Sequence, residues 1–183
     1  MNTESLLRSP IGKLFARILA TAMESRFRYR FFGPTKILEG VGDLRDQTVL
    51  EVGCGTGFFT IPVARLIGDH GSLVAIDIIP ESVEMVSKKV QSAKLQNVRV
   101  IKTDALNTNL DTASFETVLL FGVIPSPMVP LIPLLTELHR VLRPSGILAV
   151  WPPVPGWLPR SVQKSGLFTL INKRNNVYNF KRS

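Results

Sequence analysis

Four residues between positions 51 and 57 have the types and the spacing to bind a small ligand. Glu51 is followed by glycines at alternate positions, Gly53, Gly55 and Gly57. Glycine accepts positive φ and, without a Cβ, lets the backbone lie directly against a ligand. A carboxylate beside such a loop repels a pyrophosphate and attracts a cation. The pattern therefore predicts a ligand that carries positive charge rather than phosphate.

The glycine spacing differs from the dinucleotide-binding fingerprint. In G-x-G-x-x-G the third glycine allows the helix to pack closely on the strand. Here the third glycine comes one residue early, and Phe58 occupies the position that a dinucleotide site keeps small. The alternative interpretation is a tight strand-to-helix turn that binds nothing.

A second acid, Asp77, lies 20 residues after Gly57 and directly follows the apolar run 73–76. In a doubly wound sheet, a carboxylate at the end of the second strand accepts hydrogen bonds from ribose hydroxyls. A helix-capping role is the weaker interpretation, because the next helix begins three residues later, at Pro80. The loop and the acid together predict a nucleoside site.

Strands and helices alternate in the elements that must position these residues. Apolar runs predict strands at 48–52, 73–76, 98–101, 117–121 and 147–151, and apolar residues at helical spacing predict helices at 34–42, 58–67, 80–95 and 131–142. This alternation predicts an α/β fold with a Rossmann-like, doubly wound, mostly parallel sheet. The fully apolar run 117–121 belongs at the sheet centre, beside 48–52.

The C-terminal part predicts a different arrangement. Residues 152–161 contain too many prolines for a full helix, so only a short turn is expected at 162–165. Residues 168–173 and 177–181 predict two strands around an Asn175-Asn176 turn, because asparagine tolerates positive φ. The sheet is therefore expected to close with an antiparallel hairpin, after a turn at 142–146.

The stretch E-V-G-C-G-T-G, between a strand and a helix, resembles the first motif of the class I S-adenosylmethionine-dependent methyltransferases. F-F-T after the glycines and R-V-L-R-P at 140–144 resemble the small-molecule and quinone-type group, methyltransferase type 11. In that family's L-K-P-G-G turn a glycine stands where this chain has Ser145. The resemblance covers roughly residues 35–183 and implies the class I methyltransferase fold with S-adenosyl-L-methionine as the cofactor.

The resemblance also implies which residues bind the cofactor. Ile78 would contact adenine, and Asp104 with Ala105 resembles the third motif, which reads the adenine amino edge; a general turn role for Asp104 is the alternative. The complete predicted set is Glu51, Gly53, Gly55, Gly57, Phe58, Asp77, Ile78, Asp104, Ala105, Phe121 and Gly122.

The loop after the fourth strand, GVIPSPMVP at 122–130, contains no His, Asp, Glu or Lys. It also lacks the Asn/Asp-Pro-Pro-aromatic tetrad of the amino-methylating nucleic-acid enzymes. A sulfonium methyl is already activated, so proximity can supply much of the rate acceleration. We therefore predict no catalytic base and no metal.

Candidate substrate contacts are Phe32, Ser126 and Trp151; a turn role for Ser126 and a core-capping role for Trp151 and Trp157 are the alternatives. His139 is expected to be packed or at the surface.

Composition indicates one soluble domain, residues 34–183, preceded by a basic amphipathic segment, residues 1–33. The net charge is +8 over 183 residues, and it is concentrated at the two ends. Residues 1–36 hold seven Lys and Arg against two acids, and residues 151–183 hold six against none. The basic ends predict an acidic partner or surface. The single cysteine, Cys54, excludes an internal disulfide, suits a reducing cytoplasmic location and disfavours arsenic methylation.

Apolar residues at helical spacing between Pro10 and Met23 predict an N-terminal helix. It could cover the cofactor cleft as a lid, or residues 10–30 could contact a membrane surface. Residues 26–32 alternate basic and aromatic side chains, and a connecting segment is favoured over a nucleic-acid site because the footprint is small. No apolar run is long enough to span a bilayer.

The function predicted from these observations is methyl transfer to a small, apolar or lipid-associated acceptor. A protein or RNA substrate, attracted by the basic ends, is the first alternative. The second is a non-catalytic subunit that binds S-adenosylmethionine and serves a partner.

Overall fold

The computed structural model describes residues 33–126, 129–152 and 159–183. The predicted N-terminal helix, Phe32 and Trp157 lie outside the described residues. The boundary between an N-terminal segment and the domain, and the membrane contact of residues 10–30, therefore stay predictions.

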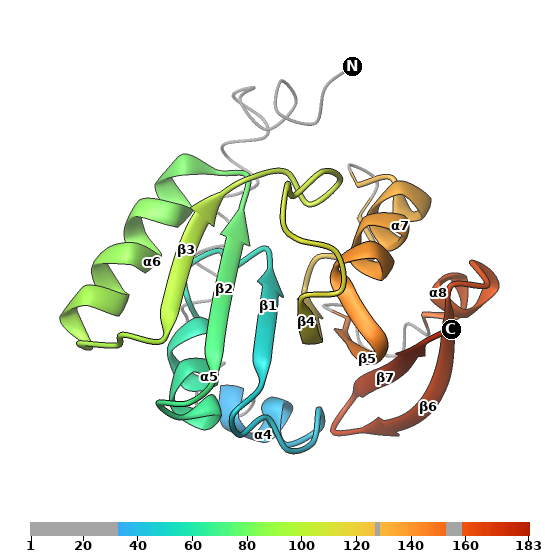
Figure 1. Cartoon of the computed structure of the whole chain (residues 1–183), viewed down its shortest axis with the longest axis horizontal. Coiled ribbons are helices and arrows are strands. Elements are labelled where there is room, and N and C mark those ends of the chain that lie inside the picture. Colours follow the sequence, from blue (N-terminus) through green and yellow to red (C-terminus); the bar gives the residue numbers. More distant parts are fainter. Residues whose placement is uncertain (1–32, 127–128, 153–158) are drawn as a thin grey trace.

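In the described part of the chain, seven strands form one sheet in the order β3-β2-β1-β4-β5-β7-β6 (Figure 1). The strands are β1 (Thr48–Val52), β2 (Ser72–Asp77), β3 (Val98–Lys102), β4 (Phe115–Phe121), β5 (Leu142–Trp151), β6 (Phe168–Arg174) and β7 (Val177–Arg182). The helices are α4 (Pro34–Leu38), α5 (Thr60–Ile67), α6 (Pro80–Ser92), α7 (Leu131–Val141) and α8 (Arg160–Lys164). The first five strands are parallel and β7 is antiparallel, which confirms the predicted α/β, Rossmann-like doubly wound fold with its C-terminal hairpin.

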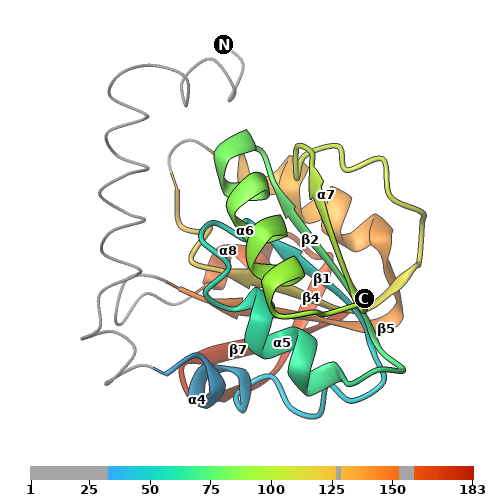
Figure 2. The ribbon, with the colours of Figure 1, turned by 90° about the vertical axis from the view of Figure 1, so that its left-hand side faces the viewer.

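Strand β1 lies at the point where the order of the sheet reverses. It pairs with β2 on one side and with β4 on the other, where Val52 lies opposite Leu120, so the predicted central position of β4 is confirmed. Residues of α5 pack on one face of the sheet with Val49, and residues of α7 pack on the other with Leu50. Figure 2 shows α5 and α6 on the near side and α7 beyond them. The carboxyl ends of β1 and β4 therefore border the crevice where doubly wound proteins bind ligands.

Several predicted boundaries were wrong, and three of the differences have a clear physical reason. Helix α5 begins at Thr60 instead of residue 58, because Phe58 and Phe59 are buried in the turn that precedes it. Helix α6 ends at Ser92 instead of residue 95, because Lys94 has a φ of 54° and leaves the helical conformation. Strand β5 begins at Leu142, where a turn was predicted, because Leu142 already pairs with Phe115.

The C-terminal hairpin is confirmed and is fixed to the domain by its asparagines. Asn175 and Asn176 have φ of 49° and 62°, as the predicted turn requires. The side-chain amide of Asn175 donates to the carbonyl of Lys36 (2.6 Å), and that of Asn179 donates to the carbonyl of Gly40 (2.8 Å). The hairpin therefore holds α4 and the turn after it in place.

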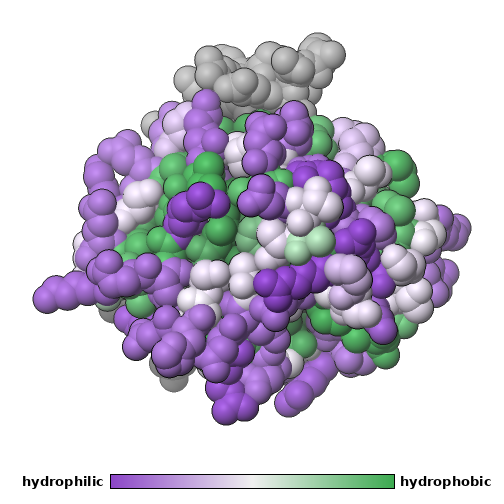
Figure 3. Space-filling view, in the orientation of Figure 1, coloured by the Kyte–Doolittle hydropathy of each residue, from purple (hydrophilic) through white to green (hydrophobic). Residues whose placement is uncertain are grey.

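The connection between β3 and β4, residues 103–114, contains no helix. Figure 3 shows an apolar area over β2 and β3 beside α6. Among the described residues, none of the helices is both long enough and apolar enough to cross a lipid bilayer.

Candidate cofactor site

The glycine loop after β1 is attached to the end of β2. The amides of Gly53 and Cys54 both donate to the carbonyl of Ile76, at 2.8 and 3.0 Å. Gly53, Gly55 and Gly57 all have positive φ, of 73°, 52° and 82°. A Cβ on Gly55 would have no neighbour nearer than 3.9 Å, so this residue presents open backbone to a ligand.

The other two glycines make room for protein instead. A Cβ on Gly57 would lie 3.2 Å from a methyl group of Val86 on α6, and one on Gly53 would lie 2.8 Å from Val123. These glycines let α6 and the segment after β4 approach the loop. Of the three predicted glycines, Gly55 is therefore the one whose free side faces open space.

Asp77 joins the end of β2 to this loop. Its Oδ2 accepts a hydrogen bond from the amide of Gly55 (2.8 Å), and its Oδ1 accepts one from the amide of Ile79 (2.9 Å). Burial raises the pKa of the Asp77 carboxyl, and the amides of Ile79 and Gly55 oppose that rise. The structure thus brings two parts of the predicted nucleoside site, the glycine loop and Asp77, into direct contact. Ile78, which follows Asp77 directly, is half-buried.

Asp104 and Ala105 follow the neighbouring strand. Lys102 pairs with Asp77, and the amide of Thr103 donates to the carbonyl of Asp77 at 3.0 Å, which brings the end of β3 beside the end of β2. The carboxylate of Asp104 accepts a hydrogen bond from the amide of Leu106 (2.9 Å), as a turn residue would. The turn role is therefore present, and contact with the adenine edge stays a prediction.

Glu51 is buried beneath the loop on the side of α5. Its side chain is 3% exposed, and Oε2 accepts a hydrogen bond from the hydroxyl of Thr60, the first residue of α5 (2.7 Å). Burial raises the pKa of Glu51 to about 8; the Thr60 hydrogen bond opposes this rise and the charge of Asp77 adds to it. Contact between Glu51 and a cationic part of the cofactor stays a prediction.

The aromatic residues of the site form one buried cluster around Phe59. The ring centroid of Phe59 lies 4.8 Å from that of Phe58, 4.9 Å from Phe121 and 6.0 Å from Trp151, all edge to face. Phe121 and Trp151 are paired at the carboxyl ends of β4 and β5. Sequence reasoning did not single out Phe59, since nothing in an apolar run marks one phenylalanine as its centre. The cluster forms an apolar floor under the end of the sheet where the site lies.

The segment after β4 supplies the other predicted contacts. Gly122 has a φ of 74°, a Cβ on it would meet nothing within 4 Å, and its amide donates to the carbonyl of Trp151 (2.9 Å). Ser126 is half-buried, and its carbonyl accepts a hydrogen bond from the amide of Val129 (3.3 Å), in agreement with a turn role. Cys54 is buried within the glycine loop, and this burial raises the pKa of its thiol.

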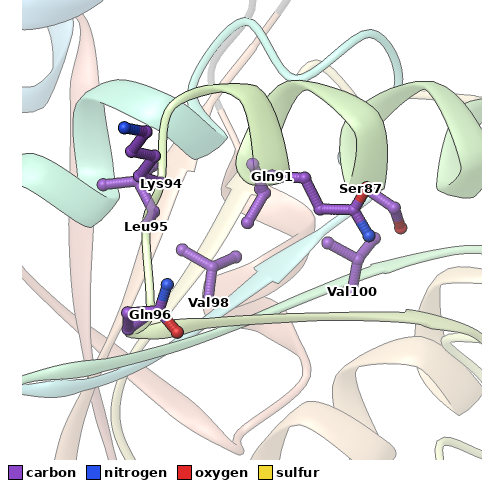
Figure 4. A pocket seen from close by; sticks show the side chains of 8 residues that line it. Ser87, Gln91, Lys94, Leu95, Gln96, Val98 and Val100 are labelled. Atoms are coloured by element: carbon purple, nitrogen blue, oxygen red, sulfur yellow. The ribbon is translucent and has the colours of Figure 1, made fainter.

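Two further features lie away from the loop. A cavity of about 390 Å³ lies between α6 and β3, lined by Gln91, Val98 and Val100 among others, and Lys94 is its one ionisable lining residue (Figure 4). His139 packs edge to face on Phe168 of β6, as expected of a structural histidine. Among the described residues, no cluster of His, Cys, Asp and Glu side chains could hold a metal ion.

A doubly wound sheet with a glycine loop and an acid at its switch point defines a class of α/β proteins that bind nucleoside cofactors. A sequence model described as "Methyltransferase domain" matches residues 49–146, more than half of the chain. The chain belongs to this methyltransferase family. The predicted class I S-adenosylmethionine-dependent methyltransferase, and S-adenosyl-L-methionine as its cofactor, are thereby confirmed at the level of the family.

Curated relatives match the same region. The chain is 34% identical over 120 residues to a demethylmenaquinone methyltransferase from Listeria welshimeri, covering 62% of this chain and 49% of the relative. A demethylmenaquinone methyltransferase from Staphylococcus aureus is 29% identical over 116 residues, covering 62% and 46%. The chain spans about half the length of these relatives.

Solved structures share the fold. A SAM-dependent methyltransferase from Aquifex aeolicus superposes with a TM-score of 0.72 at 23% identity, covering 90% of this chain and 96% of that chain. The PH0226 protein from Pyrococcus horikoshii superposes with a TM-score of 0.74 at 19% identity, covering 93% and 99%.

The site residues fit S-adenosylmethionine in two respects. Each carboxylate oxygen of Asp77 accepts one backbone hydrogen bond, which leaves a lone pair on each for a ribose hydroxyl. Open space on the free side of Gly55 lets a ligand lie against the backbone. Asp77 and the loop would therefore hold the nucleoside part, beside the apolar floor made by the aromatic cluster.

Proposed function

We propose that this protein transfers a methyl group from S-adenosylmethionine to a small, apolar acceptor. The observation that carries the proposal is the hydrogen bond between Asp77 and Gly55, because it joins the acid proposed to bind ribose to an open glycine backbone at the switch point of the sheet. The family to which the chain belongs supports the proposal independently.

When bound, S-adenosylmethionine supplies a methyl group that its positively charged sulfur has already activated. The protein's part is then to bind and orient. Asp77 would hold the ribose, and the buried rings of Phe59, Phe121 and Trp151 would exclude water from the floor of the site. Because residues 122–126 contain no His, Asp, Glu or Lys, the acceptor would need a nucleophile that reacts without a protein base.

The residues beyond β4 support an acceptor with an apolar body. Val123 is half-buried beside Gly53 after Gly122, and Trp151 ends the adjacent strand. Such an apolar border favours an acceptor with an apolar body, and the names of the curated relatives, demethylmenaquinone methyltransferases, support a lipid-like one. A protein or RNA substrate would find few polar partners there.

For residues 10–30 we propose a contact with the membrane surface, which would bring the chain to a lipid acceptor at the cytoplasmic side. The support is the apolar stripe of this basic segment. Replacing Leu14 and Ile18 by Asp in the full chain should weaken flotation with lipid vesicles. Unchanged flotation would favour the lid interpretation.

Two measurements test the proposed function. Calorimetry of the full chain with S-adenosylmethionine and with S-adenosylhomocysteine should show binding of both. Methyl-labelled cofactor, incubated with fractionated lipid, protein and RNA, should transfer label to the lipid fraction. Label in the protein or RNA fraction would show that the acceptor is a macromolecule instead of a small apolar molecule. Cofactor binding without any methyl transfer would indicate a non-catalytic subunit. No binding at all would overturn the proposal.

A further inference from the structure

The C-terminal hairpin and α8 carry positive charge that the rest of the described protein does not neutralise. Residues 151–183 contain no acid. One cation of this region, Arg182, donates to the carbonyl of Leu142 and serves the fold. The other five are exposed, and none forms an ion pair with a described carboxylate: Arg160, Lys164, Lys173, Arg174 and Lys181.

Two aliphatic side chains lie among these cations. Leu170 and Ile171 are 38% and 50% exposed, and all residues of β6 from 169 to 174 are exposed. Strand β6 is the edge of the sheet, and Figure 1 shows the hairpin at the opposite end of the molecule from α6 and β3. We call β6, the turn at 175–176, Lys181 and α8 the hairpin edge.

The backbone of β6 is unsuited to pair with another strand. Its register shifts between Leu170 and Asn172, which leaves Ile171 as an extra, unpaired residue. Such a bulge interrupts the hydrogen-bonding pattern that an added strand would follow. A second copy of this chain would also bring the same cations against themselves. The geometry and the charge therefore argue against a β-strand partner and against a homodimer through this edge.

Nucleic acid also fits poorly, because the aromatic rings of the hairpin are not available. Binding of single strands relies on exposed aromatic side chains on which bases stack. Phe168, Tyr178 and Phe180 are 2%, 4% and 1% exposed, and the ammonium group of Lys173 lies over the ring of Tyr178, 4.9 Å from its centroid. The hairpin edge presents aliphatic side chains and cations to its surroundings and keeps its rings inside.

The position of the hairpin relates this surface to the cofactor site. Tyr178 pairs with Val150, near the end of β5, so the turn at 175–176 lies at the same end of β5 as Trp151. Lys173 and Arg174 precede that turn directly. A surface bound by the hairpin edge would therefore lie toward the end of the sheet where the parallel strands finish and the acceptor is expected.

We propose that the hairpin edge docks this protein on anionic membrane lipid, with the five cations bound to headgroups and Leu170 and Ile171 inserted at the interface. Lysine and arginine near an anionic bilayer are attracted by its surface potential, and exposed aliphatic groups gain by leaving water. Docking does not depend on methyl transfer, so its failure would leave the proposed function intact.

The first test is co-flotation of the full chain, without cofactor, with vesicles of phosphatidylcholine alone or mixed with phosphatidylglycerol. The unaltered chain should bind the mixed vesicles and bind the neutral ones at least several-fold more weakly. Reversing Lys173 and Arg174 to Glu should weaken binding roughly tenfold or more. A second variant, with Arg160 and Lys164 reversed to Glu, changes α8 instead of β6 and should also weaken binding to the mixed vesicles.

The matched control reverses Arg65 and Arg99 to Glu, which changes the net charge equally. Both side chains are exposed, and Arg99 lies on β3, the opposite edge strand. The control should lower binding much less than either hairpin-edge variant. Circular dichroism and affinity for S-adenosylhomocysteine should match the unaltered chain, which shows that the variants are folded. Equal losses in control and hairpin-edge variants, or no loss in the latter, would overturn the proposal.

A fluorescent label locates the contact. Because Cys54 is buried, an environment-sensitive thiol dye should react selectively with the new cysteine of an Ile171→Cys variant. Gln96→Cys provides an exposed control position just before β3, at the opposite edge of the sheet. Mixed vesicles should raise the emission and shift it to the blue at position 171 and leave position 96 unchanged. A response at neither position contradicts the proposal. RNA binding of the Lys173 and Arg174 variant is a further check: if this variant loses RNA binding and keeps vesicle binding, the hairpin edge binds nucleic acid and the proposal is overturned.

Discussion

The carboxylate of Asp77 and the backbone amide of Gly55 are joined by a hydrogen bond of 2.8 Å, although 22 residues separate them in sequence. This bond fixes the glycine loop against the end of β2 before any cofactor arrives. Asp77 therefore has two roles, as a support of the loop and as the proposed acceptor of ribose hydroxyls, and substitutions must separate them.

Replacing Asp77 by Asn should weaken binding of S-adenosylhomocysteine by about 1–3 kcal/mol, since charge-assisted hydrogen bonds to the ribose are lost. Asn also presents an amide group where Gly55 or Ile79 needs an acceptor, so a modest loss of stability should accompany it. Calorimetry measures the affinity and thermal unfolding the stability. Asp111→Asn, an exposed acid in a loop, is the control. An unchanged affinity at lowered stability would show that Asp77 only supports the loop.

Replacing Gly55 by Ala should reduce both cofactor affinity and stability. The φ of 52° costs a residue with a Cβ about 1–2 kcal/mol, and the new methyl group occupies the open side of the loop. Gly166 has a φ of 75° and equally open surroundings, so Gly166→Ala should lower stability by a similar amount while leaving affinity unchanged. A larger group, as in Gly55→Val, should abolish binding. Equal affinities in the two alanine variants would exclude Gly55 from the site.

Glu51 makes stability depend on pH. Its pKa is raised to about 8 in the folded protein, from its ordinary value of 4.5. The folded state thus holds this proton more tightly than the unfolded state, and the resulting stabilisation, full below pH 4.5, is lost as pH rises to about 8. Denaturant unfolding of the unaltered chain and of Glu51→Gln should show the variant gaining relative stability between pH 5 and 8, in a range set by that pKa. A difference that is constant with pH would contradict the shift.

The same acid should couple proton release to cofactor binding. A cation near Glu51 favours its ionised form, so binding of S-adenosylmethionine at neutral pH should release up to about one proton, and binding of the neutral S-adenosylhomocysteine sulfur should release less. Calorimetry in buffers of different ionisation enthalpy measures this number. Glu51→Gln should abolish the difference between the two ligands; if the difference persists, another group carries it.

Ser145 has a φ of 64° within β5, a conformation that favours glycine. Ser145→Gly should therefore raise the free energy of unfolding by about 0.5–1 kcal/mol, since the relief of left-handed strain exceeds the entropy that glycine adds to the unfolded chain. Chemical denaturation checks this value. Ser145→Ala keeps the Cβ and should be nearly neutral, so a similar gain in both variants would show that the hydroxyl, and not the backbone, is the cause.

The parallel strands, the glycine loop and the C-terminal turn could be predicted from local signals. Hydrophobic runs bounded by glycine or an acid mark buried strands whatever their partners, so 48–52 was predicted with its observed bounds. The interval from Gly57 to Asp77 is one helix and one strand long, which puts both at one end of a parallel sheet. The Asn175-Asn176 turn could be predicted because only its backbone conformation had to be recognised.

The predictions that failed concern residues whose state depends on distant neighbours. A phenylalanine at a helix start and one packed in a turn have the same local pattern, and only contacts with Phe121 and Trp151 place Phe59 before α5. Leu142 joins β5 because Phe115, 27 residues earlier, lies beside it. Neither partner can be identified from spacing along the chain.

The sequence by itself determined the cofactor class, because a glycine loop and an acid at a set interval are chemical requirements carried by residue type. Only the tertiary structure decided how those residues act. It buried Glu51 against Thr60, bound Asp77 to Gly55 and left five cations of the hairpin edge without an ion pair among the described residues. Burial and hydrogen-bond pairing are properties of residues that meet in space, and these meetings are set by the packing of the whole sheet.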